Sequence, residues 1–229
     1  MTMIWIPLLA FFAIAPAEEN PMTLKMTLHE MSLKAQASPE ELSPERLEEL
    51  DAMAAWVADQ PLETPTELTF ICTHNSRRSH MGQIWAQAAA WHFGLNDVCT
   101  FSGGTEATAF NPRAVRALRE LGVTIDVSKE ADNPVYTVQL QSDRPSFEAF
   151  SKTYGDAANP SEGYAAVMVC SSADQGCPIV YGSAARFAIP YIDPKVSDGT
   201  DAEAATYRAR AMQIGAEAFY VMARAAELR

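Results

Sequence analysis

Apolar positions along the chain follow two spacings, one typical of strands and one typical of helices. Short apolar runs predict five buried strands, at residues 68–71, 98–101, 136–140, 164–169 and 187–191. Longer segments with apolar residues three and four positions apart predict helices, at residues 79–93, 111–122 and 201–228. Because strands and helices alternate, we expect an α/β fold with a central parallel sheet and helices on both faces.

The N-terminal part of the chain is predicted to form a helical arm over residues 18–64. Residues 18–37 are polar and predict no element. Residues 38–41 read Ser-Pro-Glu-Glu, which combines an N-cap, a proline at the first helical position and a capping-box glutamate, and residues 43–45 repeat the start of that signal. Apolar residues then follow at helical spacing, so a helix is expected to reach about Asp59 and to pack on the main domain. A helix that binds a partner is the alternative.

The first residues have some features of a secretory signal peptide. Residues 4–15 form an apolar run of suitable length, and residues 15–17 (Ala-Pro-Ala) offer a cleavage site. The run is too short to span a bilayer as a helix. No Lys or Arg precedes it, and Met22 and Met26 are alternative starts. Residues 1–17 are therefore either a signal peptide or the product of a start placed too early.

Composition and charge narrow the classes of function. The 229 residues are 48% hydrophobic and 20% charged, which suits one globular domain, expected at residues 65–229. The net charge of −12 argues against a nucleic-acid partner and against stable association with a membrane. Four cysteines are too few for a disulfide scaffold, which favours catalytic, redox or buried roles. Cys99 lies within a predicted strand and is expected to be buried and inert.

Polar residues collect where the predicted strands end. Cys72, residues 102–105, Cys170 and Asp193 each follow a strand. Because the carboxyl ends of parallel strands share one edge of a sheet, and ligands bind there, we expect these residues to lie together. Residues 141–163 are rich in Pro, Ser, Asp and Gly and are predicted to form a long surface excursion.

Residues 72–79 carry the clearest chemical signal. They read Cys-Thr-His-Asn-Ser-Arg-Arg-Ser, a Cys-x5-Arg-Ser pattern between a strand and a helix. Such a loop points its N–H groups and a helix dipole at one spot, which favours an oxyanion and the thiolate form of Cys72. Arg78 can bind two oxygens at once, Ser79 can hydrogen-bond the sulfur and Asn75 can pin the loop. The other candidate oxyanion-binding residues are Thr73, His74, Ser76 and Arg77. A buried cysteine beside two solvated arginines is the alternative.

This loop resembles the phosphate-binding loop of the low-molecular-weight protein tyrosine phosphatase superfamily, which includes the thioredoxin-coupled arsenate reductases. The resemblance covers roughly residues 68–228. Three further segments support it: Ser-Gly-Gly-Thr-Glu at 102–106, Asn-Pro-Arg-Ala at 111–114 and Tyr-Ile-Asp-Pro at 191–194. It implies that Asp193 is the general acid. A simple Asp-Pro turn is the alternative.

A second pair of cysteines points to the reductase branch. Residues 170–178 read Cys-Ser-Ser-Ala-Asp-Gln-Gly-Cys-Pro, which is similar to the relay segment of the arsenate reductases. The resemblance implies that Cys72 attacks arsenate and that Cys170 attacks Cys72, which releases arsenite. Cys177 then takes over a disulfide that thioredoxin or a similar dithiol reduces. No bound cofactor is expected, and no metal, since the pair lacks the short spacing of zinc sites.

Other readings of the same residues stay open. The pair Cys170 and Cys177 is also compatible with a static disulfide, and Cys170 with an ordinary strand residue. The main alternative function is hydrolysis of a phosphomonoester, such as phosphotyrosine, through a phosphocysteine at Cys72. A third possibility is an oxyanion-binding or redox-sensing module without turnover.

The sequence departs from the superfamily pattern at several positions. Arg77 stands where many relatives have a second cysteine, so no disulfide can form within the loop. His74 stands where glycine is frequent, and His80 replaces the usual proline or glutamine; both histidines are expected at the rim. A thiol relay needs a reducing compartment, so we expect a cytoplasmic protein, and a periplasmic one if residues 1–17 are a genuine signal peptide.

Overall fold

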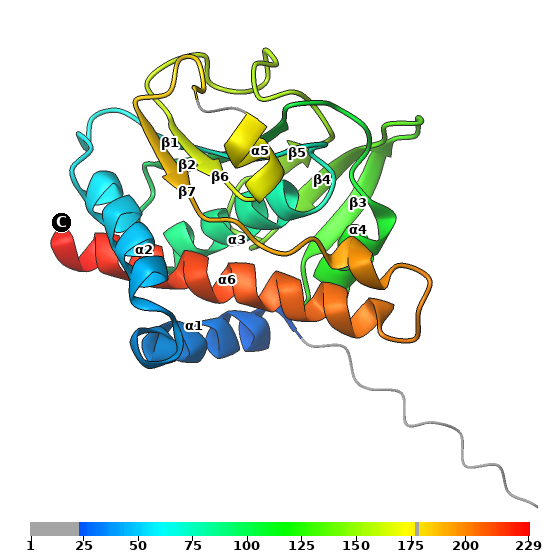
Figure 1. The fold of residues 1–229 in the computed structure, drawn as a ribbon, viewed down its shortest axis with the longest axis horizontal. Coiled ribbons are helices and arrows are strands. Elements are labelled where there is room, and N and C mark those ends of the chain that lie inside the picture. The colour runs from blue at the N-terminus through cyan, green and yellow to red at the C-terminus, as the bar shows by residue number, and fades with distance from the viewer. Residues whose placement is uncertain (1–22, 177–178) are drawn as a thin grey trace, which may run out of the picture.

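The computed structural model of the chain describes residues 23–176 and 179–229, and its centre is a parallel sheet (Figure 1). Neighbouring strands follow the order β2-β1-β6-β7. In the register, Cys72 lies opposite Gly104 and Ile71 opposite Met168, so the ends of three strands meet at one edge. The predicted α/β class is confirmed. The strands are β1 (Thr66–Cys72), β2 (Val98–Gly104), β6 (Ala165–Met168) and β7 (Ala185–Ala188).

The longest helix of the described residues, α6 (Glu203–Leu228), runs below the sheet, with α1 on its other side (Figure 1). Four other helices pack against it, and one of them also covers β1 and β2. These four are α1 (Leu24–Glu41), α2 (Pro44–Ala58), α3 (Arg78–His92) and α4 (Pro112–Glu120). Local signals set two of the starts: the side chains of Ser43 and Asn111 cap α2 and α4, and each helix has proline at its first position.

A second, antiparallel sheet lies beside the first. It consists of β3 (Thr124–Lys129), β4 (Val135–Gln139) and β5 (Phe147–Ala149), in the order β3-β4-β5. The strand predicted at 136–140 exists, but its expected place in the parallel sheet is wrong. The connection from β3 is too short for the crossover that parallel strands require. The pattern did not reveal β3, because only Ile125 in it is buried.

The N-terminal segment contains two helices where the sequence predicted one. Residues 24–37, expected to form no element, belong to α1, which continues to Glu41. Ser38 is not an N-cap; it lies within the helix and its Oγ donates to the carbonyl of Lys34 at 3.1 Å. The buried side of α1 packs on α6, where Gly215 leaves room for Met31. Only Leu28 and Met31 on this side are large apolar residues, and Thr27, Ala35 and Ser38 are small or polar, so the apolar pattern does not predict the helix.

The segment expected to be a surface excursion is partly buried. Ser151, Lys152 and Asn159 are each less than one tenth exposed. Gly104 N donates to the carbonyl of Lys152 at 2.9 Å, and Tyr154 N donates to the carbonyl of Gly104 at 2.9 Å. The segment therefore extends the edge of β2 and reaches the end of the sheet where Cys72 lies.

Within 23–176 and 179–229, no helix is long and apolar enough to cross a membrane. Residues 1–17, the candidate signal peptide, lie outside the described part.

Candidate active site

The loop after β1 holds Cys72 next to two polar side chains. Cys72 is 4% exposed, and its Sγ lies 3.1 Å from Ser79 Oγ. Asn75 Nδ2 donates to the same Oγ at 2.8 Å. Since that hydroxyl accepts a hydrogen bond from the amide, its own proton is free to point at the sulfur. The sulfur therefore has a hydroxyl donor within hydrogen-bonding distance.

Asn75 determines the shape of the loop. It has a positive φ of 44°, a conformation that asparagine tolerates better than most residues. Its Oδ1 accepts a hydrogen bond from Lys152 N at 2.8 Å, so the segment after β5 holds the loop from outside. Ser151 Oγ donates to the carbonyl of His74 at 3.0 Å. The excursion is therefore part of the support for the loop.

The glycines at the end of β2 let the backbone approach the loop. Thr105 N donates to the carbonyl of Cys72 at 3.1 Å, and Glu106 N donates to that of Thr73 at 2.8 Å. A Cβ on Gly104 would lie 2.7 Å from Asn75 N. No side chain fits there, which explains the glycine that the sequence places after this strand.

Arg78 joins the loop to the segment that carries Asp193. Its Nη2 donates to Asp193 Oδ2 at 2.8 Å, and its Nη1 donates to the carbonyl of Tyr191 at 2.9 Å. The other oxygen of Asp193 accepts from Lys195 N at 3.1 Å and caps the short helix η1 (Pro194–Ser197). The structure brings these two predicted site residues together at the edge where Cys72 lies. An oxyanion in the loop would compete with the carboxylate for the guanidinium.

Cys170 lies beside the loop as well. It follows β6, the strand next to β1, and is 1% exposed. Its Sγ lies 3.5 Å from Thr73 Oγ1 and accepts a hydrogen bond from Ala173 N at 3.3 Å, at the start of α5 (Ser171–Gly176). Cys177 lies outside the described residues. None of the three cysteines in the described ranges is in a disulfide, and those ranges hold no cluster of three metal-ligating side chains.

Comparisons with known proteins agree on one family. The model of the low molecular weight phosphotyrosine protein phosphatases matches residues 67–137. Arsenate reductase 2 of Staphylococcus epidermidis is 32% identical over 127 residues, which are 55% of this chain and 76% of that protein. The protein belongs to the low-molecular-weight protein tyrosine phosphatase superfamily, close to its arsenate reductases.

Two further proteins are also similar to parts of the chain. The arsenate reductase of Brevibacillus brevis is 31% identical over 120 residues, covering 51% of this chain and 68% of that protein. A low-molecular-weight protein tyrosine phosphatase structure from T. tengcongensis is 19% identical, with a TM-score of 0.47, and covers 69% of this chain and 98% of that one.

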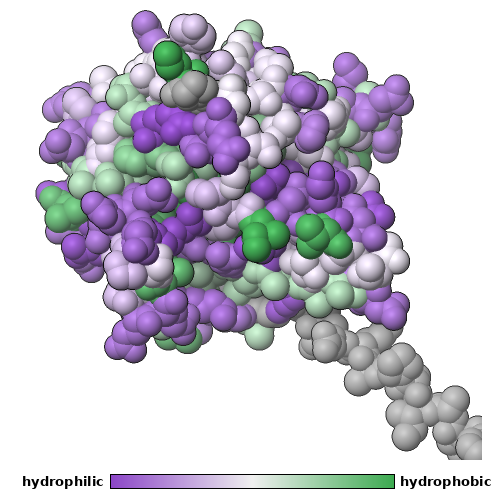
Figure 2. Space-filling view, viewed as in Figure 1, coloured by the Kyte–Doolittle hydropathy of each residue, from purple (hydrophilic) through white to green (hydrophobic). Residues whose placement is uncertain are grey.

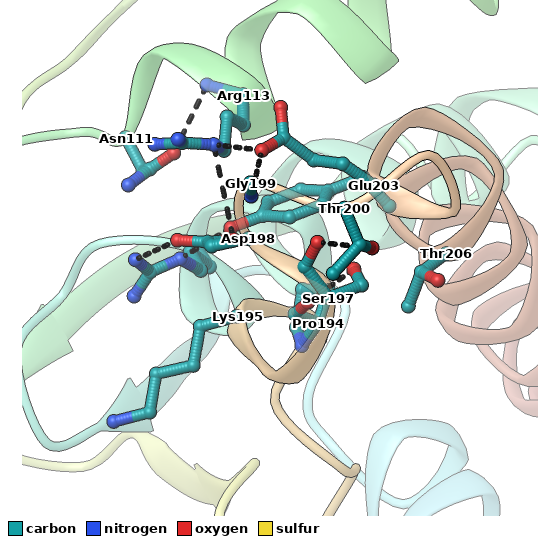
Figure 3. A network of polar contacts seen from close by, with 12 residues as sticks. Asn111, Arg113, Pro194, Lys195, Ser197, Asp198, Gly199, Thr200, Glu203 and Thr206 are labelled. Carbon is teal, nitrogen blue, oxygen red and sulfur yellow. Dashed lines mark hydrogen bonds and ion pairs between the residues drawn. The ribbon is translucent and has the colours of Figure 1, made fainter.

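Arg77, which stands where the resemblance implies a second cysteine in the loop, is held in a polar network. Its Nε donates to Tyr207 Oη at 2.8 Å, and Tyr207 donates to Asp198 Oδ1 at 2.8 Å. Burial and this bond to Asp198 raise the pKa of Tyr207 to about 12. Figure 3 shows Asp198 close to Arg113 and Glu203, which form an ion pair at 2.7 Å. The network ties the loop to the start of α6.

The two histidines near the loop lie in different environments. His74 is half exposed, at the rim as expected, with Nε2 3.9 Å from Glu106. His80 is fully buried, so its predicted place at the rim is wrong. Its ring stacks on Phe110 with 3.9 Å between centroids, and its Nδ1 lies 3.2 Å from Ser102 Oγ. Burial, with the nearby charge of Lys152, lowers the pKa of His80 well below its usual value, so it supports the loop as a neutral ring.

The remaining predicted residues are also placed. Ser76 is buried and its carbonyl accepts from Asn111 N at 2.9 Å, which connects the loop to the start of α4. Cys99 is only partly buried, which corrects the expectation of a buried thiol; burial and the charge of Glu67 raise its pKa. Figure 2 shows a largely hydrophilic face with isolated hydrophobic spots. Two exposed apolar residues, Ile192 and Val196, lie one position before and three positions after Asp193 in the chain.

Proposed function

We propose that the protein is an arsenate reductase in which Cys72 is the nucleophile and Cys170 and Cys177 form a thiol relay, with thioredoxin or a similar dithiol as the reductant. One observation carries this proposal: Cys170 Sγ lies 3.5 Å from the hydroxyl of Thr73, the residue next to Cys72. A second buried thiol at this position has no part in ester hydrolysis. The arsenate reductases among the relatives support the same choice.

In the first step, arsenate binds to the N–H groups of residues 73–77 and to Arg78, which leaves Asp193 to face the substrate. The thiolate of Cys72 attacks arsenic and forms a sulfur–arsenic bond. One arsenate oxygen departs as water with a proton from Asp193. Ser79, whose hydroxyl accepts from Asn75, donates to the sulfur until it attacks.

In the second step, the thiolate of Cys170 attacks the sulfur of Cys72. A disulfide forms, and the electron pair of the broken sulfur–arsenic bond reduces arsenic to the arsenite that leaves. Cys177 then attacks Cys170, which frees Cys72 and leaves a disulfide between Cys170 and Cys177. An external dithiol takes over that disulfide. A relay of this kind works in a reducing compartment, so we propose a cytoplasmic location, which sequencing of the mature N-terminus would test.

The test is arsenite production in the presence of thioredoxin, its reductase and NADPH. A Cys177→Ser protein should release at most one arsenite per molecule and accumulate a disulfide between Cys72 and Cys170, detected by peptide mapping without reduction. Cys99→Ser is the matched control and should keep full turnover. Repeated turnover by the Cys177→Ser protein would refute the relay.

Phosphomonoester hydrolysis is a second candidate, favoured by one observation. The pair Cys72 and Ser79 and the pair Arg78 and Asp193 contain every group that a phosphocysteine mechanism requires. In that case hydrolysis of an aryl phosphate should survive Cys170→Ser. If the unmodified protein shows neither activity but binds phosphate, it is an oxyanion-binding module without turnover.

A further inference from the structure

A buried polar cluster joins α2 to the segment before Asp193. Glu217 on α6 is 2% exposed, and its Oε2 accepts hydrogen bonds from Arg46 Nε at 2.9 Å and from Tyr191 Oη at 2.9 Å. Arg46 Nη2 also donates to the carbonyl of Pro190 at 3.2 Å, and its guanidinium lies 4.8 Å from the centre of the Tyr191 ring. Arg46 thus contacts residues 190 and 191 directly and through Glu217.

Tyr191 connects this cluster to the candidate active site. Its carbonyl accepts the hydrogen bond from Arg78 Nη1 at 2.9 Å, while Arg78 Nη2 bonds Asp193. Burial, with the charge of Glu217, raises the pKa of Tyr191 well above its usual value, so the phenol keeps its proton and donates to Glu217. The contacts therefore run without a break from Arg46 on α2 to the guanidinium of Arg78.

This cluster does more than attach α2. The apolar residues of α2 already provide a buried contact, namely Leu50, Met53, Ala54 and Val57. A buried carboxylate is costly unless it is paired and hydrogen-bonded, so for attachment alone apolar packing would serve as well. The planar guanidinium of Arg46 adds contacts with a defined geometry, because it holds the Pro190 carbonyl and the Tyr191 ring at the same time.

We propose that Arg46 is a positioning residue for the oxyanion site. It holds Glu217 and Tyr191 so that the Tyr191 carbonyl keeps one side of the Arg78 guanidinium in place, while the other side remains able to exchange Asp193 for a substrate oxygen. The inference rests on the proposed role of the Cys72 loop as an oxyanion site. In this proposal α2, which precedes the region matched by the family model, helps to position the oxyanion site.

The test measures phosphate binding by calorimetry and by protection of Cys72 from iodoacetamide, using full-length Arg46→Met and Arg46→Lys proteins. Phosphate affinity should fall about tenfold in Arg46→Met, since a small displacement of a binding group has effects of this order or larger. Arg46→Lys should recover part of it, because an ammonium group can pair with Glu217. In turnover assays, KM should rise more than kcat falls.

Asp51→Asn is the matched control. Asp51 also joins α2 to α6, by accepting from Tyr220 Oη at 2.9 Å, and this partner is outside the cluster of Arg46, Glu217 and Tyr191. This variant should lose stability without losing phosphate affinity. If Arg46→Met does not fold, Tyr191→Phe and Glu217→Gln take its place, and both should weaken phosphate binding.

The outcomes separate the two proposals. If the unmodified protein binds phosphate and the Arg46, Tyr191 and Glu217 variants bind it equally well, the positioning role is overturned while the proposed function stands. If the unmodified protein neither binds phosphate nor turns over either substrate, the proposed function itself fails.

Discussion

Replacing Asn75 with aspartate tests whether the contacts among Asn75, Ser79 and Cys72 stabilise a thiolate at Cys72. Asn75 accepts from Lys152 N and donates to Ser79 Oγ, each at 2.8 Å. Aspartate has the same shape, can keep the bond to Lys152 and tolerates the positive φ of 44°. It replaces the donor that faces Ser79 with a charged oxygen, so the Ser79 hydroxyl must turn its proton away from the sulfur.

The size of the effect follows from the distances. Ser79 Oγ lies 2.8 Å from the Asn75 amide nitrogen and 3.1 Å from Cys72 Sγ, so the new carboxylate and the sulfur are at most about 6 Å apart. At an effective dielectric constant of about 20, two negative charges at that distance repel by about 3 kcal/mol. Since about 1.4 kcal/mol corresponds to one pH unit and the carboxyl ionises before the thiol, the midpoint of thiolate formation should rise by about two pH units.

The assay follows alkylation of Cys72 by iodoacetamide against pH, with mass spectrometry of the peptide that contains Cys72. Asn75→Gly is the control, because it also removes the donor to Ser79 Oγ, accepts a positive φ and adds no charge; unlike aspartate, it loses the bond from Lys152 N as well. Its midpoint should rise by less than half as much as that of Asn75→Asp. Equal midpoints in the two variants would refute the electrostatic reasoning.

Three further predictions concern the support of the loop. Burial lowers the pKa of His80, so the folded state binds fewer protons there than the unfolded state; urea unfolding should show stability falling as pH drops below about 6.5, and His80→Gln should flatten that slope. An equal slope would contradict this reading. Burial also lowers the pKa of Lys152 to about 8, so keeping this side chain charged costs stability at pH 7. Lys152→Met should therefore stabilise the protein by about 2 kcal/mol at pH 7, once the lost contact with Phe150 is subtracted, and by progressively less between pH 8 and 10.5. A Lys152→Met protein that is less stable at pH 7 would contradict this prediction. Gly104→Ala forces a Cβ to 2.7 Å from Asn75 N and should cost about 3 kcal/mol in urea unfolding, whereas an unchanged midpoint would show that the loop can shift.

Local patterns were sufficient for much of the fold. The strands around 68–71 and 98–101 and the helices that open near Ser79 and at Asn111-Pro112 were predictable, because apolar spacing and capping residues act over a few positions. The second sheet was not predictable as a separate sheet. Its strands are short and half exposed, and only the chain folding around them decides which neighbour they pair with.

The candidate site also has parts that the sequence determines and parts that only the tertiary structure decides. The chain itself determined the loop from Cys72 to Ser79, because a nest of N–H groups needs only consecutive residues between a strand and a helix. Tertiary structure alone decided that Arg78 bonds Asp193 across 115 positions, that Lys152 holds Asn75 across 77, and that Arg46 meets Glu217 across 171. Those polar groups have many possible partners in the sequence, and the packing of distant segments selects one of them by bringing it within hydrogen-bonding distance.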